Sequence, residues 1–121
     1  MYLYINGYKL CQCGLETNLL DYFGNSLKTG DLVCVLGTNS LTQEINYYSE
    51  SLSPVAVCQF RENGKILNKD EIKENAYIMG IKGVYPSDGW RAVLVKKHKE
   101  IIDGKILTNG WCGIEFKYKN F

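Results

Sequence analysis

The fold class is indicated near the start of the chain by Tyr2-Leu3-Tyr4-Ile5-Asn6-Gly7-Tyr8-Lys9-Leu10-Cys11-Gln12-Cys13. Two runs rich in aromatic and β-branched residues flank the Asn6-Gly7 pair. Asn-Gly suits a type I′ turn because both central residues of that turn need a positive φ. The segment therefore predicts a β-hairpin, and with it an antiparallel sheet.

Extended runs separated by turn residues continue through the rest of the chain. Residues 32–36 are apolar throughout, which predicts a strand covered on both faces. Residues 42–49 alternate loosely and are expected to pair back on it. Proline cannot donate to a central ladder, so Pro54 is expected to open a new strand over residues 55–60. Further extended segments are expected over residues 76–79, 91–97 and 111–118, with a hairpin through Asp103-Gly104 over residues 100–107.

One segment has a good helix start. Asn68 can cap a helix, and Glu71, three residues later, completes a capping box. This helix is expected to be short and to end by Asn75. A second helical turn is expected over residues 17–24, with Thr17 as its N-cap.

Short strands at this spacing are typical of a sandwich or a small barrel and not of a βαβ sheet. The expected fold is mainly β: a small antiparallel barrel or sandwich with an SH3-like element and one short helix near residues 68–75. A length of 121 residues fits one β-rich domain spanning residues 1–121.

Composition places the chain among ordinary globular proteins, with 45% hydrophobic and 22% charged residues. Residues 1–60 carry two basic and five acidic residues, and residues 61–121 carry twelve basic and eight acidic ones, for a formal net charge of +1. A local basic face is therefore allowed, although the whole molecule does not attract polyanions. Nine tyrosines and two tryptophans exceed the needs of a core of this size, so some rings are expected at the surface.

The compartment follows from what the sequence lacks. No basic region followed by an apolar core opens the chain, and no apolar run approaches the ~20 residues that span a bilayer. Five cysteines without framework spacing indicate free thiols in a reducing environment. The expected location is the cytoplasm of a host cell, with no membrane partner.

Residues 17–33 contain the pattern D-x-x-G-x-x-L-x-x-G-D-x-V, which starts at Asp21. This pattern resembles the opening of the barrel in the YopX family of small phage proteins, and similar strings open other SH3-like barrels. Gly24 and Gly30 permit tight turns, Leu27 fills the end of a barrel, and Asp31 caps the turn before the strand. The resemblance implies an SH3-like element and a phage or prophage source. The chain has no counterpart of the family's closing segment, and the resemblance transfers no functional residue.

The cysteines are candidates for a metal site. Cys11 and Cys13 would face one side of a strand, and a tetrahedral zinc site would need further ligands from Cys34, Cys58, Cys112 or His98. The C-x-C spacing is not that of a zinc knuckle, and Cys34 and Cys58 lie in apolar runs. The sequence thus favours buried free thiols, with no metal and no cofactor.

His98 is the single histidine, in Lys96-Lys97-His98-Lys99. A Ser-His-Asp or Cys-His site would need it, but the flanking ammonium groups disfavour its protonated form, and no serine or cysteine lies in a nucleophile motif. We therefore expect a solvated surface histidine and a protein that is not an enzyme. An enzyme that depends on cysteine and His98 is the remote alternative.

A basic cluster is the best candidate for contact with nucleic acid. It comprises Arg91, Lys96, Lys97, Lys99 and Lys105. Tyr85 and Trp90 lie nearby in sequence, and their rings suit stacking on bases. However, on a strand Val93 and Val95 would point to the same face as Arg91 and Lys97, so the basic side chains would not form a continuous basic face. Exposed lysines also protect sheet edges from pairing with other strands.

Other aromatic residues are candidates for a protein contact: Tyr47 and Tyr48, and Tyr85 and Trp90 in the loop over residues 85–90. A tryptophan after a rigid turn is either a core residue or a binding anchor, and its usual burial favours the core.

The leading hypothesis is a small non-catalytic binding protein, encoded by a phage or prophage. It would occupy a partner surface or sequester a ligand, as an inhibitor of host defence does. The expected partner is a protein or a small nucleotide-like ligand, and a homo-oligomer is a further option. The alternative is an SH3-like nucleic-acid-binding module.

Overall fold

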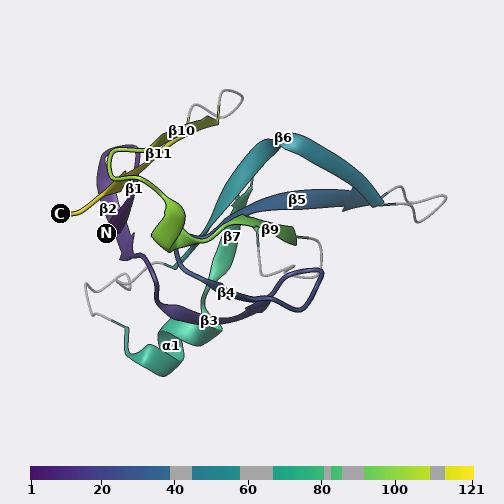
Figure 1. Ribbon diagram of the computed structural model, residues 1–121. Helices are drawn as coiled ribbons and strands as arrows, with labels where there is room; N and C mark the ends of the chain where they lie inside the picture. Colours follow the sequence, from purple (N-terminus) through teal and green to yellow (C-terminus); the bar gives the residue numbers. More distant parts are fainter. Residues whose placement is uncertain (39–44, 58–66, 81–82, 86–91, 110–113) are drawn as a thin grey trace.

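The computed structural model describes residues 1–38, 45–57, 67–80, 83–85, 92–109 and 114–121. Antiparallel sheets and one short α-helix make up this described part, so the expectation of a mainly β, antiparallel fold is confirmed (Figure 1). Among the described strands the sheets remain separate, and no closed barrel forms. In the same ranges no helix has the length and apolarity needed to cross a membrane.

One sheet has four strands in the order β10-β11-β1-β2. β1 (Tyr2–Ile5) and β2 (Tyr8–Gln12) form the expected hairpin, whose turn residues Asn6 and Gly7 have φ values of 46° and 86°. β11 (Ile114–Lys119) pairs with β1, and β10 (Ile106–Asn109) pairs with β11. The first and last strands of the chain are therefore neighbours in this sheet.

A second sheet has five strands in the order β8-β7-β6-β5-β9. The strands are β5 (Leu32–Thr38), β6 (Ile45–Ala56), β7 (Tyr77–Gly80), β8 (Gly83–Tyr85) and β9 (Ala92–Lys96). The long β5–β6 hairpin confirms that the segment after residues 32–36 pairs back on them, in the described range from Ile45 onward.

The expectation for Pro54 is wrong. Pro54 does not open a strand but lies near the end of β6, opposite Leu32 of β5. The ladder tolerates it because the main chain of the next residue, Val55, makes the hydrogen bonds to the β5 side, from its N–H to Asp31 and from Gly30 to its carbonyl. The missing N–H of Pro54 thus points to the other side, where β7 pairs only from Val55 onward. The predicted remainder of that strand, residues 58–60, lies outside the described residues.

Residues 16–28 form a two-stranded ladder of β3 (Glu16–Leu20) and β4 (Ser26–Lys28), so the expected helical turn over residues 17–24 is wrong. The Thr17 hydroxyl donates to the main-chain oxygen of Leu27 across the ladder at 2.6 Å, so the cross-strand contact outweighs a local N-cap. The tight turns expected at Gly24 and Gly30 are confirmed by their positive φ. Leu27 is buried at 1% exposure, but it does not fill the end of a barrel, because the described strands close none.

The helix α1 (Lys69–Glu74) has the predicted cap and ends before Asn75. Glu71 donates its N–H to the Asn68 side chain at 2.9 Å, and the Asn68 amide donates back to the Glu71 carboxylate at 2.8 Å. The first bond is the N-cap bond expected from the sequence, whereas the return bond comes from the Asn68 side-chain amide and not from its backbone N–H as in a standard capping box.

The predicted hairpin over residues 100–107 is only half present. A turn with Gly104 at φ 87° leads into β10, but a 3-10 turn, η2 (His98–Glu100), stands where the first arm was expected. β10 pairs instead with β11, and the Gly104 N–H donates to Tyr118 of that strand. A long-range partner therefore replaced the local one.

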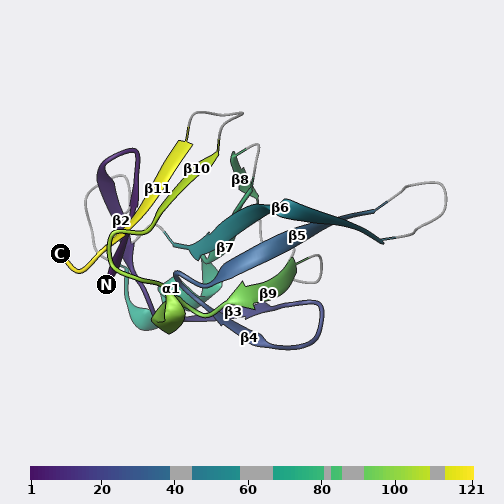
Figure 2. The ribbon, with the colours of Figure 1, turned by 45° about the horizontal axis from the view of Figure 1, so that its top comes forward.

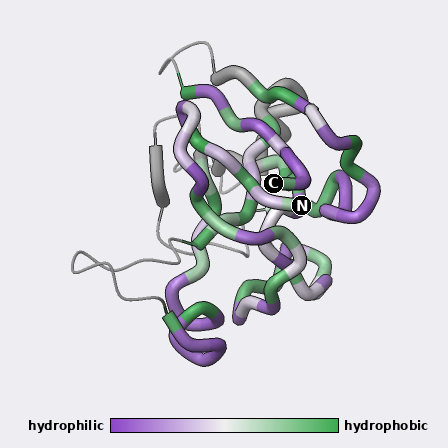
Figure 3. The backbone as a smooth tube through the Cα atoms, turned by 90° about the vertical axis from the view of Figure 1, so that its left-hand side faces the viewer, coloured by the Kyte–Doolittle hydropathy of each residue, from purple (hydrophilic) through white to green (hydrophobic). Residues whose placement is uncertain are grey.

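Around Leu32, Val33, Val55 and Ala56, the described part of the five-stranded sheet is buried on both faces. Its neighbouring residues alternate between two clusters: Leu32 and Ala56 join Leu3, Phe116 and Tyr118, while Val33 and Val55 join Leu19 and Leu27. The four-stranded sheet thus covers one face and the β3–β4 ladder the other (Figure 2). Hydrophobic and hydrophilic residues are interspersed along much of the described chain (Figure 3). The prediction that residues 32–36 are covered on both faces is confirmed for Leu32 and Val33.

Candidate functional site

The basic cluster predicted from the sequence is only partly described. Lys96 ends β9, and Lys97 and Lys99 follow around η2; all three are exposed. Lys105 is exposed as well. Arg91 lies outside the described residues.

The predicted aromatic contacts fall on strands or outside the described chain. Tyr47 pairs with Leu36 in the ladder, Tyr48 follows it in β6, and Tyr85 ends β8 opposite Ile78. The side chains of these three tyrosines are not among the described ones, and Trp90 lies outside the described residues. β8 and β9 are opposite edges of the five-stranded sheet, so the ladder does not place Tyr85 beside Lys96.

His98 is not the solvated surface histidine expected from its lysine neighbours. Its side chain is only 23% exposed, and its ring Nδ1 lies 2.9 Å from Oδ1 of Asp31. The His98 main-chain N–H donates to the same oxygen at 2.7 Å. The second oxygen of the 3%-exposed Asp31 accepts from the N–H of Lys28 at 2.9 Å. The turn cap predicted for Asp31 is thus confirmed, and this carboxylate also fixes the return of the chain after β9.

Two glycines make room for this arrangement. A Cβ on Gly30 would lie 2.7 Å from Cys13 Sγ and 3.1 Å from His98 Cβ, and a Cβ on Gly14 would lie 3.0 Å from His98 Nε2. Cys13 and His98 therefore both pack against Gly30, and the His98 ring pairs with Asp31. A sequence separation of 67 residues between Asp31 and His98 hid this meeting from local pattern analysis.

The chemistry of that cluster favours a structural role. Burial raises the pKa of the Cys13 thiol to about 11, with a smaller lowering by the N-terminal charge and a smaller raising by Asp31. A thiol with this pKa is protonated near neutral pH and is a poor nucleophile. The Asp31 carboxylate accepts hydrogen bonds from the main-chain N–H groups of Lys28 and His98 and lies beside the His98 ring, as expected of a fixed cross-link between the start of β5 and η2.

The metal-ligating residues of the sequence do not form a cluster in the described part of the chain. There, no three histidine, cysteine or acidic side chains lie close enough together to hold an ion. Cys11 and Cys34 are buried, as expected from apolar surroundings. Cys58 and Cys112 lie outside the described residues.

The loop between β3 and β4 is held from within by Asp21. This 4%-exposed carboxylate accepts from the N–H groups of Phe23 (3.0 Å) and Asn25 (2.7 Å), from the Asn25 amide (3.0 Å) and from the N–H of Leu94 on β9 (3.0 Å). Burial alone would raise the pKa of Asp21, but these hydrogen bonds, led by the Asn25 side chain, outweigh it and lower the pKa.

This anchored loop and the end of β3 carry three large apolar side chains into solvent. Leu20 is 53% exposed, Tyr22 48% and Phe23 72%. The rings of Tyr22 and Phe23 meet edge to face, with centroids 5.2 Å apart. The Tyr22 N–H also donates to the Ala92 carbonyl on β9 at 2.7 Å, which ties the loop to the five-stranded sheet. We call Leu20, Tyr22 and Phe23 the loop patch.

A second surface lies on the outer face of the four-stranded sheet. In the ladder Tyr2 stands opposite Lys119, and Tyr4 stands between Lys117 and Lys9. The Lys9 ammonium lies 4.2 Å from the centroid of the Tyr2 ring, and the Lys119 ammonium 5.2 Å from that of Tyr4. We call these five residues the lysine–tyrosine face.

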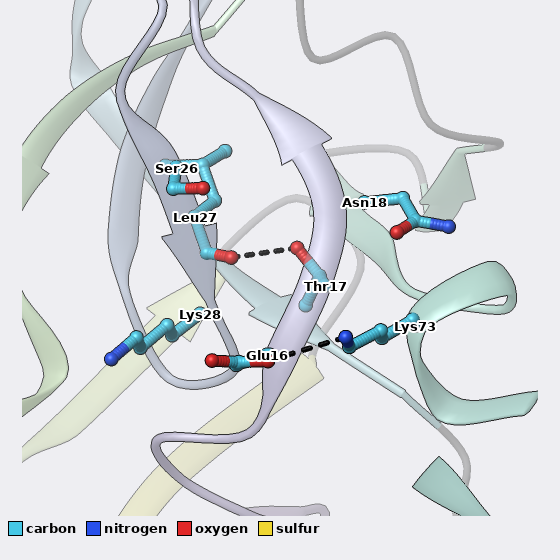
Figure 4. Close-up of a pocket in the computed structure, with 7 residues that line it drawn as sticks. All are labelled: Glu16, Thr17, Asn18, Ser26, Leu27, Lys28 and Lys73. Carbon is cyan, nitrogen blue, oxygen red and sulfur yellow. Dashed lines mark hydrogen bonds and ion pairs between the residues drawn. The ribbon is translucent and has the colours of Figure 1, made fainter. Parts of the chain in front are cut away.

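The described residues also form a polar hollow of about 270 Å³ between β3, β4 and α1 (Figure 4). It is lined by Glu16, Thr17, Asn18, Ser26, Leu27, Lys28 and Lys73. The Lys73 ammonium lies 3.3 Å from the Glu16 carboxylate, and both side chains are well exposed, so this pair adds little. The only apolar member, Leu27, turns its side chain into the core. Small-molecule sites usually have apolar walls, so this hollow suits a nucleotide-like ligand poorly.

Sequence analysis missed both surfaces, although a signal for the loop patch was present. Asp21 and Gly24 occupy the first and fourth positions of a turn, closed by the Gly24 N–H donating to Asp21 at 3.0 Å. Tyr22 and Phe23 are then its central residues, which must point outward. The lysine–tyrosine face had no such signal, because β11 joins β1 across the whole length of the chain.

Comparisons of the chain with family models, with curated proteins and with solved structures gave no match. The resemblance of residues 17–33 to the YopX family therefore stays a prediction.

Proposed function

We propose that this protein is a non-catalytic binding protein that occupies the surface of a partner protein, and that the loop patch is its contact. The proposal includes the phage or prophage origin and the inhibition of a host defence system expected from the sequence. It also retains an SH3-like identity for the segment of residues 17–33.

The observation that carries the proposal is the combination of exposure and rigidity in the loop patch. Exposed aromatic rings are expensive to keep in water and are common as anchors at protein interfaces. Here the main chain beneath the rings is anchored by the Asp21 carboxylate through four donors. A partner that binds such a preordered loop loses little conformational entropy on binding.

Other functional classes have less support. Burial keeps the Cys13 thiol protonated near neutral pH, and the His98 ring is held by Asp31, which disfavours an enzyme. The polar hollow lacks apolar walls, which disfavours sequestration of a small ligand. A nucleic-acid site at Lys96, Lys97 and Lys99 is supported by their exposure alone.

The test compares the two exposed rings of the loop patch with a single exposed ring elsewhere. A tagged form of the protein captures its partner from a bacterial lysate, the partner is identified by mass spectrometry, and the affinity of the purified pair is measured by calorimetry. Tyr22→Ala with Phe23→Ala should weaken binding at least a hundredfold, since anchor residues often contribute ~2 kcal/mol or more each. Tyr8→Ala, which removes a 79%-exposed ring from β2, should leave the affinity within about threefold.

If both variants bind as tightly as the unchanged protein, the loop patch is not the contact. If the double variant instead dissociates a homodimer seen by native mass spectrometry, the occupant of the patch is a second copy of the chain.

A further inference from the structure

We propose that the lysine–tyrosine face binds single-stranded nucleic acid. This function goes beyond the protein contact assigned to the loop patch and uses a different sheet. It also differs from the site at residues 91–99 considered from the sequence.

The first step of the argument is the division of the four-stranded sheet into two faces. Leu3, Phe116 and Tyr118 are at most 2% exposed and join the core. Successive residues of a strand point to opposite faces, so Tyr2 and Tyr4 on β1 point outward, as do Lys117 and Lys119 on β11. The register sets two rings in the central strand, with lysines on both sides.

The second step concerns the charge of this face. Lys9, Lys117 and Lys119 supply three ammonium groups, and in the described part of the chain no carboxylate lies within ion-pair distance of any of them. The acidic residue nearest along β11 is Glu115, two positions before Lys117. The ammonium groups of Lys9 and Lys119 rest over tyrosine rings instead, an arrangement that holds positive charge against an aromatic surface.

The third step identifies the ligand that needs both groups. Phosphodiesters are attracted by the ammonium groups, and unpaired bases stack on aromatic rings. Tyr2 and Tyr4 are two residues apart on an extended strand, about 6.8 Å at ~3.4 Å per residue. This spacing exceeds one stacking step of ~3.4 Å, so neighbouring bases that lie on the two rings must be unstacked from each other, as in an extended single strand. A base that displaces a lysine from its ring frees that ammonium for the adjoining phosphate.

A single strand fits this face better than a duplex does. The bases of a duplex are stacked on each other, and their edges are read by elements that enter a groove. A sheet face presents rings to an open strand without entering a groove. The Tyr4 hydroxyl donates to the main-chain oxygen of Phe121, so the ring itself is held in place.

The experiment measures fluorescence anisotropy of a labelled mixed-sequence 12-nucleotide DNA strand at several salt concentrations. Lys9→Ala, Lys117→Ala and Lys119→Ala together should reduce the slope of log affinity against log salt by about 2, at ~0.7 per phosphate contact on a single strand. The matched control, Lys96→Ala with Lys97→Ala and Lys99→Ala, removes the same charge elsewhere and should leave the slope unchanged.

The rings are tested separately. Tyr2→Leu and Tyr4→Leu should each weaken binding by about five- to a hundredfold through lost stacking, whereas Tyr2→Phe keeps the ring and should bind as the unchanged protein does. Thermal unfolding checks that each variant is folded. Tyr22→Ala with Phe23→Ala should not affect the oligonucleotide, so this inference can fail while the proposed protein contact stands.

Several results would overturn the proposal. One is no binding at low salt, and another is an equal loss with the control lysine variant. A third is equal affinity for the annealed duplex or for a polyglutamate peptide, which would assign the face to duplexes or to acidic proteins.

Discussion

Replacement of Asp21 by alanine removes the anchor of the loop patch while it leaves the exposed rings in place. The carboxylate accepts four hydrogen bonds, and all four are lost in Asp21→Ala. Phe23 and Asn25 are exposed, so their three donors regain water when the carboxylate is gone. The Leu94 N–H lies in β9 on a partly buried residue and has less access to water.

The loss of stability follows from these four bonds. A hydrogen bond to a charged group contributes about 1.5–3 kcal/mol, and a donor that can return to water loses much less. With one poorly solvated donor and three solvated ones, the free energy of unfolding should fall by about 2–4 kcal/mol in Asp21→Ala. Urea unfolding followed by circular dichroism should therefore show a midpoint lowered by roughly 1–2 M, for a slope of about 2 kcal/mol per M.

The matched control is Asp103→Ala, whose exposed carboxylate accepts one N–H, that of Asn120, at 3.0 Å. This variant should change the free energy of unfolding by less than about 1 kcal/mol. If Asp21→Ala is no more destabilising than Asp103→Ala, Asp21 does not hold the loop, and the preordering argued for the loop patch is wrong.

The same carboxylate makes a pH-dependent contribution. The pKa of Asp21 is lower in the folded protein than its ordinary value of 3.8. Its stabilising effect is therefore present above about pH 4 and is lost as the pH falls through the folded-state pKa. The stability difference between the unchanged protein and Asp21→Ala should shrink as the pH is lowered from 5 to 2, and a constant difference would contradict this assignment.

Two further predictions concern the cluster around Asp31. Iodoacetamide should modify Cys13 about a hundredfold more slowly at pH 8 than it modifies an ordinary thiol, because the pKa of Cys13 is raised from 9.0 to about 11. Peptide mass mapping measures this rate. Modification as fast as that of an ordinary thiol would contradict the raised pKa and make Cys13 a candidate nucleophile. Gly30→Ala should lower stability by more than about 2 kcal/mol, since its φ is 86° and the new Cβ would lie 2.7 Å from Cys13 Sγ. Gly104 has a similar φ of 87° but open space around it, so Gly104→Ala should lower the free energy of unfolding only by the backbone penalty of ~1–2 kcal/mol. If Gly30→Ala and Gly104→Ala lose equal stability in urea unfolding, the contact with Cys13 makes no steric contribution.

Local sequence patterns were reliable where the interacting groups are near in the chain. The Asn6-Gly7 turn, the N-cap bond between Asn68 and Glu71, and the turn cap of Asp31 all join residues a few positions apart. Their geometry depends on backbone preference and short-range hydrogen bonds, which the residue types themselves specify.

Local patterns failed where a distant partner competed. Thr17 bonds across to Leu27 instead of capping a helix, and Gly104 turns toward Tyr118 instead of a preceding strand. His98 was expected to be exposed because its sequence neighbours are lysines, but its ring lies against Asp31, 67 residues away in the chain. In each case the distant partner satisfies a polar group that the local structure would have left to water.

By itself, then, the sequence determined a mainly β chain, its short helix and turns such as the one at Asn6-Gly7. Only the tertiary structure decided the two candidate surfaces. The Asp21 anchor depends on β9, and the lysine–tyrosine face depends on β11 lying beside β1. Pairing between strands far apart in the chain fixes register, and register decides which side chains share a face, whereas turn and cap preferences act over only a few residues.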